Sequence, residues 1–167
     1  TLFTAEGLLD ARRAPGTEPL LTLDAAYRRW LRTQREPCPE SHEALTGLLA
    51  ESALWALRAP GNTCLGALGD ARRRPGTRAD NRSKGCGGVM RAAPVGLLAG
   101  IDDPFALGCA AARLTHGHPG GYLPAGVLAL LVRRLIEGAD LRTALAGSLA
   151  RLAREPGQEE VAGRERQ

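Results

Sequence analysis

The sequence predicts an all-α fold, and its composition gives the first two reasons. The 167 residues include 28 Ala and 27 Leu but only seven Val and Ile together, a balance that favours helices over strands. Hydrophobic residues make up 44% and charged residues 24% of the chain, close to the average for globular domains. A chain of this length buries roughly 68–70% of its unfolded surface, so we expect one domain with its own core, without stabilising metals or disulfides.

Apolar residues at helical spacing predict the first two helices. The run from Leu2 to Arg13 has this spacing and ends at Pro15-Gly16. No N-cap precedes the run, which suggests that the helix begins upstream of Thr1. The second helix is amphipathic and ends before Pro37, with an apolar face made of Leu23, Tyr27, Trp30 and Leu31.

Proline and glycine divide the next part of the chain. A third helix is expected from about Ser41 to Arg58, where Pro60-Gly61 stops a leucine-rich segment. Asn62 or Thr63 can cap a short helix that runs through Leu68. Residues 69–88 then form the longest irregular stretch, and loops of that length in compact domains are usually functional or disordered.

The second half of the chain predicts further helices. Helical signals resume at Val89, and Asp102-Asp103-Pro104 supplies an N-cap and a first-turn proline for a helix that reaches about Thr115. A nearly apolar helix is expected from Pro124 to Glu137. Asp140 caps the last helix, in which leucines recur at positions 141, 145, 149 and 152.

Cysteine and charge patterns narrow the classes of function. The four cysteines form no Cys-x-x-Cys pair, which argues against zinc. We find no basic stretch followed by an apolar core and a cleavage site, and no apolar run of 18 residues. We therefore expect a cytoplasmic protein with free thiols that does not span a membrane. The net charge of +4 includes a cluster at Arg72–Arg74. Because no aromatic residue interrupts this cluster, it predicts a solvated loop and not a nucleic-acid site.

Residues 81–91 are the first candidate for a ligand site, with the sequence Asn-Arg-Ser-Lys-Gly-Cys-Gly-Gly-Val-Met-Arg. Glycines let a backbone approach a ligand closely, and the free amides at the start of a helix attract phosphate. The order of residues matches neither the Walker loop nor the dinucleotide-binding fingerprint. From the residues alone, a pyrophosphate cradle and a purely structural turn are equally supported.

The second candidate is Thr115-His116-Gly117-His118-Pro119, between two predicted helices. Two histidines separated by one residue bind one metal ion only in an extended segment, and no carboxylate lies nearby in the sequence. The favoured interpretation is a histidine that hydrogen-bonds a ligand hydroxyl or the adjacent turn. Arg58–Thr63 is interpreted as a structural turn, and Asp102-Asp103 as a helix cap.

Three segments, Arg58–Thr63, Asn81–Pro94 and Thr115–Gly121, together resemble the ADP-ribosylglycohydrolase family, which includes the dinitrogenase reductase-activating type. The run Ser83–Pro94 is an almost unbroken family motif, and the likeness extends over roughly residues 1–155. The resemblance implies an all-helical domain with roughly orthogonal packing. Residues 1–154 would form the central part of this domain, without its N-terminal and C-terminal parts, and residues 155–167 a polar, flexible tail.

The resemblance also implies an activity, in which ADP-ribose is released from a modified side chain or a small molecule by hydrolysis of an N- or O-glycosidic bond. The implied partner is ADP-ribose or an ADP-ribosylated protein, without nucleic acid or membrane. Arg82 departs from the small or acidic residue expected before the motif. The loop would contact the pyrophosphate and riboses, Thr115 and His116 would hold the nucleotide, and Tyr122 would either stack on adenine or pack in the core. The implied loop residues are Ser83, Gly85, Cys86, Gly87, Gly88, Met90 and Arg91.

The family further implies two magnesium ions that polarise the ribose hydroxyls and position the attacking water. Their ligands are expected in an Asp-Asp-Thr motif before Thr1 and an Asp-x-Asp-Thr motif after Gln167, so we assign no catalytic residue and no metal ligand to this chain. Residues 1–167 by themselves are therefore expected to be inactive. They would be a segment of a longer protein, a truncated gene product or a deliberately shortened protein. A non-catalytic ADP-ribose-binding module and a structural fragment are the alternatives.

Overall fold

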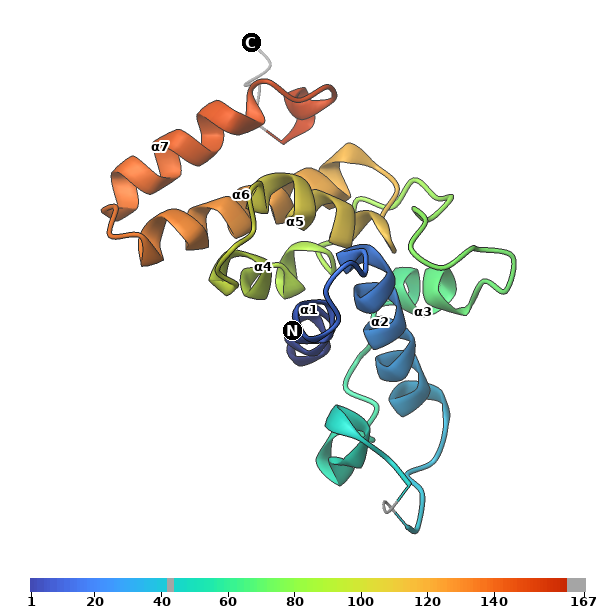
Figure 1. The fold of residues 1–167 in the computed structure, drawn as a ribbon. Helices are drawn as coiled ribbons and strands as arrows, with labels where there is room; N and C mark the ends of the chain where they lie inside the picture. Colours follow the sequence, from blue (N-terminus) through green and yellow to red (C-terminus); the bar gives the residue numbers. More distant parts are fainter. Residues whose placement is uncertain (42–43, 162–167) are drawn as a thin grey trace.

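The computed structural model describes residues 1–41 and 44–161, and this part of the chain contains seven α-helices, four short 3-10 helices and no strand (Figure 1). The all-α prediction is thereby confirmed. None of the described helices is long and apolar enough to cross a membrane. The α-helices are α1 (Leu2–Arg13), α2 (Pro19–Arg35), α3 (Asn62–Gly69), α4 (Ala93–Leu97), α5 (Pro104–Arg113), α6 (Pro119–Ile136) and α7 (Leu141–Leu152).

The helices do not line up as one parallel bundle (Figure 1). In Figure 1, α1 is seen almost end-on, while α5 and α6 lie across the view and α2 descends below them. The pair formed by α1 and α2 packs beneath α4 and α5, and α7 packs on α6. The main apolar core joins these layers, and its largest members are Phe3, Leu8, Leu23, Tyr27, Leu68, Val95 and Leu114. Complete burial of such a side chain stabilises the fold by roughly 1.5–3 kcal/mol.

The predicted capping residues of two helices are confirmed. The Asp103 carboxylate accepts a hydrogen bond from the Ala106 amide (2.9 Å), and the Asp140 carboxylate accepts one from the Thr143 amide (3.1 Å). The predicted start of α6 at Pro124 is wrong by five residues. His118 Nδ1 accepts a hydrogen bond from the Gly120 amide (3.1 Å) and caps the helix earlier, so that Pro124 lies inside α6.

The expected helix from Ser41 to Arg58 does not form. Positions 42–43 lie outside the described residues, and the rest of this segment contains two 3-10 helices, η1 (Gly47–Ala50) and η2 (Ser52–Leu54). Gly47 has a φ of +58°, which an α-helix cannot accommodate. The Leu48 amide instead donates to Glu6 Oε1 on α1 (2.8 Å), so a long-range contact replaces a helical hydrogen bond. Gly61, without a side-chain cap, occupies the N-cap position of α3 that was predicted for Asn62 or Thr63.

The leucine repeat of α7 does not form one buried face. Leu152 is buried, but Leu141, Leu145 and Leu149 are exposed, and the other buried residues of the helix are Ala144 and Ser148. Part of the predicted tail, residues 162–167, lies outside the description. The described remainder contains η4 (Gln158–Glu160), and Val161 packs against a small core cluster with Leu152.

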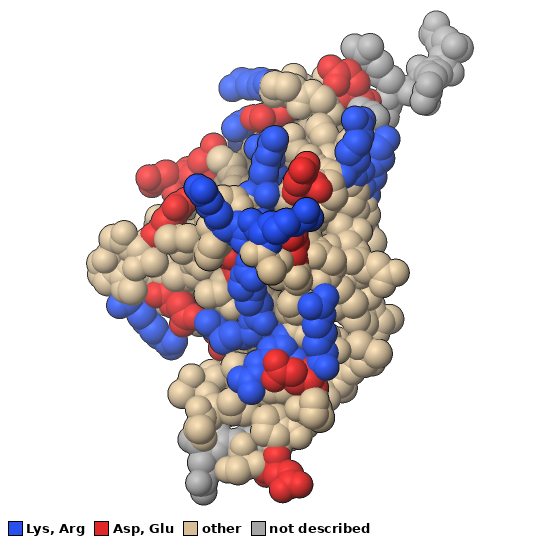
Figure 2. Space-filling model, turned by 90° about the vertical axis from the view of Figure 1, so that its right-hand side faces the viewer, with Lys and Arg blue, Asp and Glu red and all other residues tan. Residues whose placement is uncertain are grey.

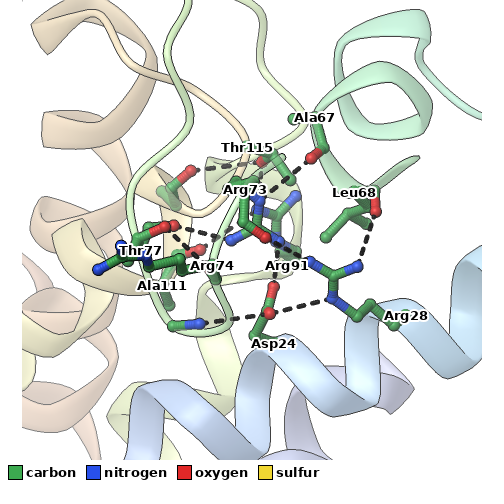
Figure 3. Close-up of polar contacts among 12 residues, drawn as sticks. Asp24, Arg28, Ala67, Leu68, Arg73, Arg74, Thr77, Arg91, Ala111 and Thr115 are labelled. Atoms are coloured by element: carbon green, nitrogen blue, oxygen red, sulfur yellow. Dashed lines mark hydrogen bonds and ion pairs between the residues drawn. The ribbon is translucent and has the colours of Figure 1, made fainter. Parts of the chain in front are cut away.

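A buried carboxylate fastens the long loop after α3 to α2. Asp24 is fully buried and forms ion pairs with Arg28 (3.1 Å) and with Arg73, and it accepts a hydrogen bond from the Gly76 amide (3.3 Å; Figure 3). Arg73 also donates to the Thr77 carbonyl (2.8 Å), which fixes the turn around it. The loop is therefore held by charge as well as by apolar packing.

This contact corrects one part of the sequence interpretation. Arg72 is solvated as predicted, with 92% of its side chain exposed, whereas only 5% of the Arg73 side chain is exposed. Figure 2 shows the face that contains this loop, on which many Lys and Arg side chains are mixed with Asp and Glu. The middle arginine of the cluster is thus a structural residue, because Asp24 lies opposite it.

We expect Asp24→Asn to lower the free energy of unfolding by about 3 kcal/mol or more, because two arginines lose their charged partner and Arg73 is buried. Urea titration followed by circular dichroism measures this loss. The matched control is Asp10→Asn, which removes a more exposed partner of Arg29 and should cost less than about 1 kcal/mol. Equal losses in the two variants would contradict the structural role of Asp24.

Candidate functional site

A cavity of about 590 Å³ opens between the N-terminal helices α1 and α2 and the glycine-rich turn at residues 85–88. Its volume lies within the range of small-molecule sites. The walls come from α1, α2, α3 and the segment before it, the turn at 85–91 and the α5–α6 connection. Six of the predicted site residues line this one cavity, namely Gly85, Cys86, Gly87, Met90, Arg91 and His116.

Asn81 joins the two segments that the sequence singled out. Its Oδ1 accepts hydrogen bonds from the amides of Ser83 and Gly117, both at 3.0 Å, and its Nδ2 donates to the Thr115 carbonyl (2.9 Å). All of its side-chain polar atoms are therefore used to hold the loop against the α5–α6 connection. This arrangement places the glycine-rich turn beside His116.

Two glycines allow this close approach. A Cβ atom on Gly117 would overlap the Asn81 carbonyl, and one on Gly121 would lie 2.5 Å from the Ser83 carbonyl. Larger residues at either position would push the loop away from the histidine segment, because the clashing atoms belong to the backbone. The glycines of the second motif therefore serve the contact between the two segments.

Ser83 lies at the edge of the site. Its hydroxyl is 2.9 Å from the Thr63 hydroxyl and accepts a hydrogen bond from the Gly85 amide (3.2 Å). Ser83 lines a smaller adjacent cavity of about 280 Å³ together with Thr63 and Asn81. Thr63 also lines the larger cavity, so the Ser83–Thr63 contact forms part of the wall between them.

The turn at residues 85–88 presents unused backbone donors. The Met90 amide donates to the Cys86 carbonyl (3.1 Å) and the Arg91 amide to the Gly88 carbonyl (3.4 Å), which starts the helical turn η3 (Val89–Arg91). Within the described part of the chain, the amides of Cys86 and Gly87 donate to no protein acceptor. Because both residues line the cavity, these amides can donate to an anionic ligand.

Arg91 supplies a positive charge that no carboxylate neutralises within residues 1–41 and 44–161. Its guanidinium stacks on the Tyr27 ring at 4.5 Å from the centroid. It also donates to the Thr115 hydroxyl at 2.6 Å (Figure 3). Its other hydrogen bonds go to the Gly87 carbonyl (3.1 Å), the Ala111 carbonyl (3.3 Å) and Cys64 Sγ (3.5 Å). All of these acceptors are uncharged. Arg91 therefore favours an anion in the cavity through its charge.

His116 is buried beside this charge, with 1% of its surface exposed. Burial, and to a smaller extent the positive charge of Arg91, lowers the pKa of His116 to about 4. The imidazole is therefore neutral at pH 7. Its Nδ1 lies 2.7 Å from the Thr115 hydroxyl, and its Nε2 edge faces the turn, where added Cβ atoms on Gly85 and Gly87 would lie 3.3 and 3.4 Å away.

Four predicted site residues do not line this cavity, namely Ser83, which lines the smaller adjacent cavity, and Gly88, Thr115 and Tyr122. Thr115 is fully buried behind His116. Gly88 is packed against α5 and α6, where an added Cβ would lie 2.9 Å from both the Ala112 side chain and the Gly121 carbonyl. Tyr122 lines a separate cavity of about 380 Å³, where its ring is covered by the Arg113 guanidinium at 4.4 Å.

The sequence interpretation missed several residues of the site. Asn81 was treated as part of a glycine-rich turn, although its side chain holds the site together. The sequence places Tyr27 and Trp30 only on the apolar face of a helix and Arg58–Thr63 in a structural turn. The structure shows that both aromatic residues, and every residue of that segment except Asn62, line the cavity. The resemblance of Arg58–Thr63 to a family motif was the one signal that pointed to this segment.

The cavity does not fit a magnesium ion, which prefers carboxylate and other oxygen ligands. No Asp or Glu is among the residues that line it. In the described portion of the chain, no three His, Cys, Asp or Glu side chains are grouped so that they could hold a metal. The wall of the cavity thus contains the cation of Arg91 and no carboxylate.

Comparison with known protein families matches residues 1–166 to the family model described as ADP-ribosylglycohydrolase. Searches of curated proteins and of solved structures gave no significant match. The matched segment includes all residues that line the cavity.

The lowered pKa of His116 predicts how stability depends on pH. In the unfolded chain this histidine takes up a proton near pH 6.5, but in the folded protein only near pH 4. The unfolded state therefore binds more protons between these values, and the free energy of unfolding should fall as the pH decreases from about 6.5 to 4. His116→Gln should remove roughly 2–3 kcal/mol of this decrease in denaturant titrations at several pH values. An unchanged pH dependence in the variant would contradict the assignment.

Proposed function

The chain belongs to the ADP-ribosylglycohydrolase family, and on this premise we propose that its cavity binds the ADP-ribose part of an ADP-ribosylated substrate. The observation that supports this most strongly is the charge of Arg91, which lies at the cavity without a carboxylate partner in the described residues. The diphosphate of ADP-ribose carries the opposite charge. It would lie against the turn at 85–88, where the free amides of Cys86 and Gly87 act as donors.

The remaining walls suit the uncharged parts of the ligand. Phe3, Tyr27 and Trp30 provide apolar and aromatic surface, and Thr63 provides a hydroxyl next to it. Aromatic surface accommodates a nucleobase, while hydroxyl groups hydrogen-bond ribose. We therefore assign the adenosine part of the ligand to this side of the cavity.

Family membership associates the site with hydrolysis of ADP-ribosyl conjugates. Our proposal gives the described residues the binding part of that activity, because the cavity wall contains no carboxylate to serve as general base or metal ligand. A non-catalytic ADP-ribose-binding module is the second candidate, since the donors described above need no metal. The dinitrogenase reductase-activating type stays a prediction.

The proposed cellular setting is the cytoplasm. None of the four cysteines, all of which lie in the described residues, forms a disulfide. Free thiols are typical of proteins in a reducing compartment. An ADP-ribosylated protein is the proposed macromolecular partner, with the ADP-ribose group as the part that enters the cavity.

We expect Arg91→Gln to weaken the binding of ADP-ribose about tenfold or more, because a unit charge close to a diphosphate contributes at least about 1.4 kcal/mol. Isothermal titration calorimetry without magnesium measures the affinity. Adenosine, which has no diphosphate, should bind both proteins equally. A similar loss for adenosine would instead indicate that the variant has damaged the cavity itself.

The matched control for this experiment is Arg113→Gln. Arg113 also stacks on a tyrosine and has a buried Nε without an acceptor in the described chain, but it lies outside the cavity. Its replacement should leave the affinity for ADP-ribose within about twofold. If wild-type protein gives only heat of dilution with ADP-ribose, the proposed function is wrong.

We expect residues 1–167 by themselves to release no ADP-ribose above background from an arginine-ADP-ribosylated protein in the presence of magnesium. The physical reason is that the cavity wall provides neither a metal ligand nor a carboxylate base. Chromatography of the released ADP-ribose measures the rate. Binding of ADP-ribose in the same preparation shows that the protein is folded, and turnover at ordinary enzyme rates, above about 1 s⁻¹, would contradict this prediction.

A further inference from the structure

The Thr115 hydroxyl lies between the charge of Arg91 and the ring of His116. Arg91 Nη2 is 2.6 Å from Thr115 Oγ1, and His116 Nδ1 is 2.7 Å from the same oxygen. A third neighbour, the Ala112 carbonyl, is 3.3 Å away. The guanidinium can only donate, so Thr115 must accept from Arg91. The hydroxyl proton is then left for either the imidazole or the carbonyl.

Three observations favour the imidazole as the acceptor of this proton. The distance to His116 Nδ1 is typical of a hydrogen bond from a hydroxyl, whereas the distance to the Ala112 carbonyl is longer than usual. That carbonyl already accepts the backbone amides of Thr115 (3.0 Å) and His116 (2.9 Å). In addition, donation by a cationic group polarises the hydroxyl and makes it a stronger donor.

We propose that Thr115 is a positioning residue that fixes the tautomer of His116, so that Nδ1 accepts a hydrogen bond and Nε2 carries the proton. Because this buried imidazole is neutral at pH 7, only one of its two ring nitrogens carries a proton, and the tautomer decides which nitrogen can donate a hydrogen bond. Nε2 forms no hydrogen bond within residues 1–41 and 44–161, and its edge faces Gly85 and Gly87. His116 therefore presents an N–H donor on the same side as the free amides of the turn.

This arrangement determines which ligand atoms can bind at this part of the cavity wall. The donors are His116 Nε2–H and the amides of Cys86 and Gly87, and Arg91 adds its charge behind them. The part of the wall formed by these groups offers donors, so it selects oxygen atoms that can only accept, such as those of a phosphate, over hydroxyl or amino groups. In ADP-ribose these are the diphosphate oxygens, and this last step rests on the proposed function.

The tautomer can be measured without any ligand. Long-range ¹H–¹⁵N correlation NMR at pH 7 distinguishes a protonated from an unprotonated ring nitrogen, and the spectrum of His116→Gln identifies the His116 signals among the three histidines. We expect a single neutral form in which Nε2 carries the proton. A protonated Nδ1 would overturn the proposal whether or not the protein binds ADP-ribose.

Two substitutions test the role of Thr115 itself. Thr115→Val has a similar shape but no hydroxyl, so Nδ1 should lose its hydrogen-bonded chemical shift and the ring should become easier to protonate. Thr115→Ser retains the hydroxyl and should restore the wild-type signals. Thermal unfolding of both variants checks that they are folded. An unchanged His116 spectrum and titration in folded Thr115→Val would show that another group sets the tautomer.

Binding experiments connect the tautomer to the ligand. Thr115→Val should bind ADP-ribose and pyrophosphate about tenfold more weakly, whereas Thr115→Ser should stay within about twofold of wild type. Wild-type protein that shows the expected tautomer but binds neither ligand would contradict the proposed function alone. A weakened affinity for adenosine in Thr115→Val would overturn the proposed phosphate preference.

Discussion

The candidate site depends on the side chain of Asn81, which holds together two segments that are far apart in the sequence. Its amide group bonds the backbone of residues 115 and 117 and, at the same time, the loop that leads into the glycine-rich turn. Because both polar atoms of this side chain have partners, its hydrogen bonds fix how the two segments lie against each other. The glycines at 117 and 121 let the backbones come close enough for it to form.

The charges near the site determine which kind of ligand it favours. Asp24 forms ion pairs with Arg28 and Arg73, which hold the preceding part of the same loop, whereas Arg91 has only uncharged acceptors in the described chain. Arg28 and Arg73 are therefore structural residues. Arg91 instead faces the cavity, where no carboxylate of the described chain balances its charge. The pKa of His116 is lowered in part by this charge, so the histidine beside it contributes a neutral ring and not a second cation.

The sequence was a good guide where local signals agreed with tertiary packing. The caps at Asp103 and Asp140 were predicted because a side-chain carboxylate satisfies amides within its own turn, whatever the rest of the fold does. The helix expected at 41–58 does not form, because here the local signals disagree with the tertiary packing. Its leucines had a suitable pattern, but Gly47 and a contact from Glu6 on α1 hold the chain in 3-10 turns, and no local signal reveals that contact.

The amino-acid sequence by itself determined the all-α class, most helix boundaries and the two segments that meet at the cavity. Only the tertiary structure decided which of their side chains share that cavity, because burial and distance depend on how the helices cross. It placed His116 and Arg91 at the wall, buried Thr115 behind them and put Tyr122 in a different cavity. It also assigned Asn81 its role, since the partners of a side-chain amide follow from three-dimensional position and not from the residue type.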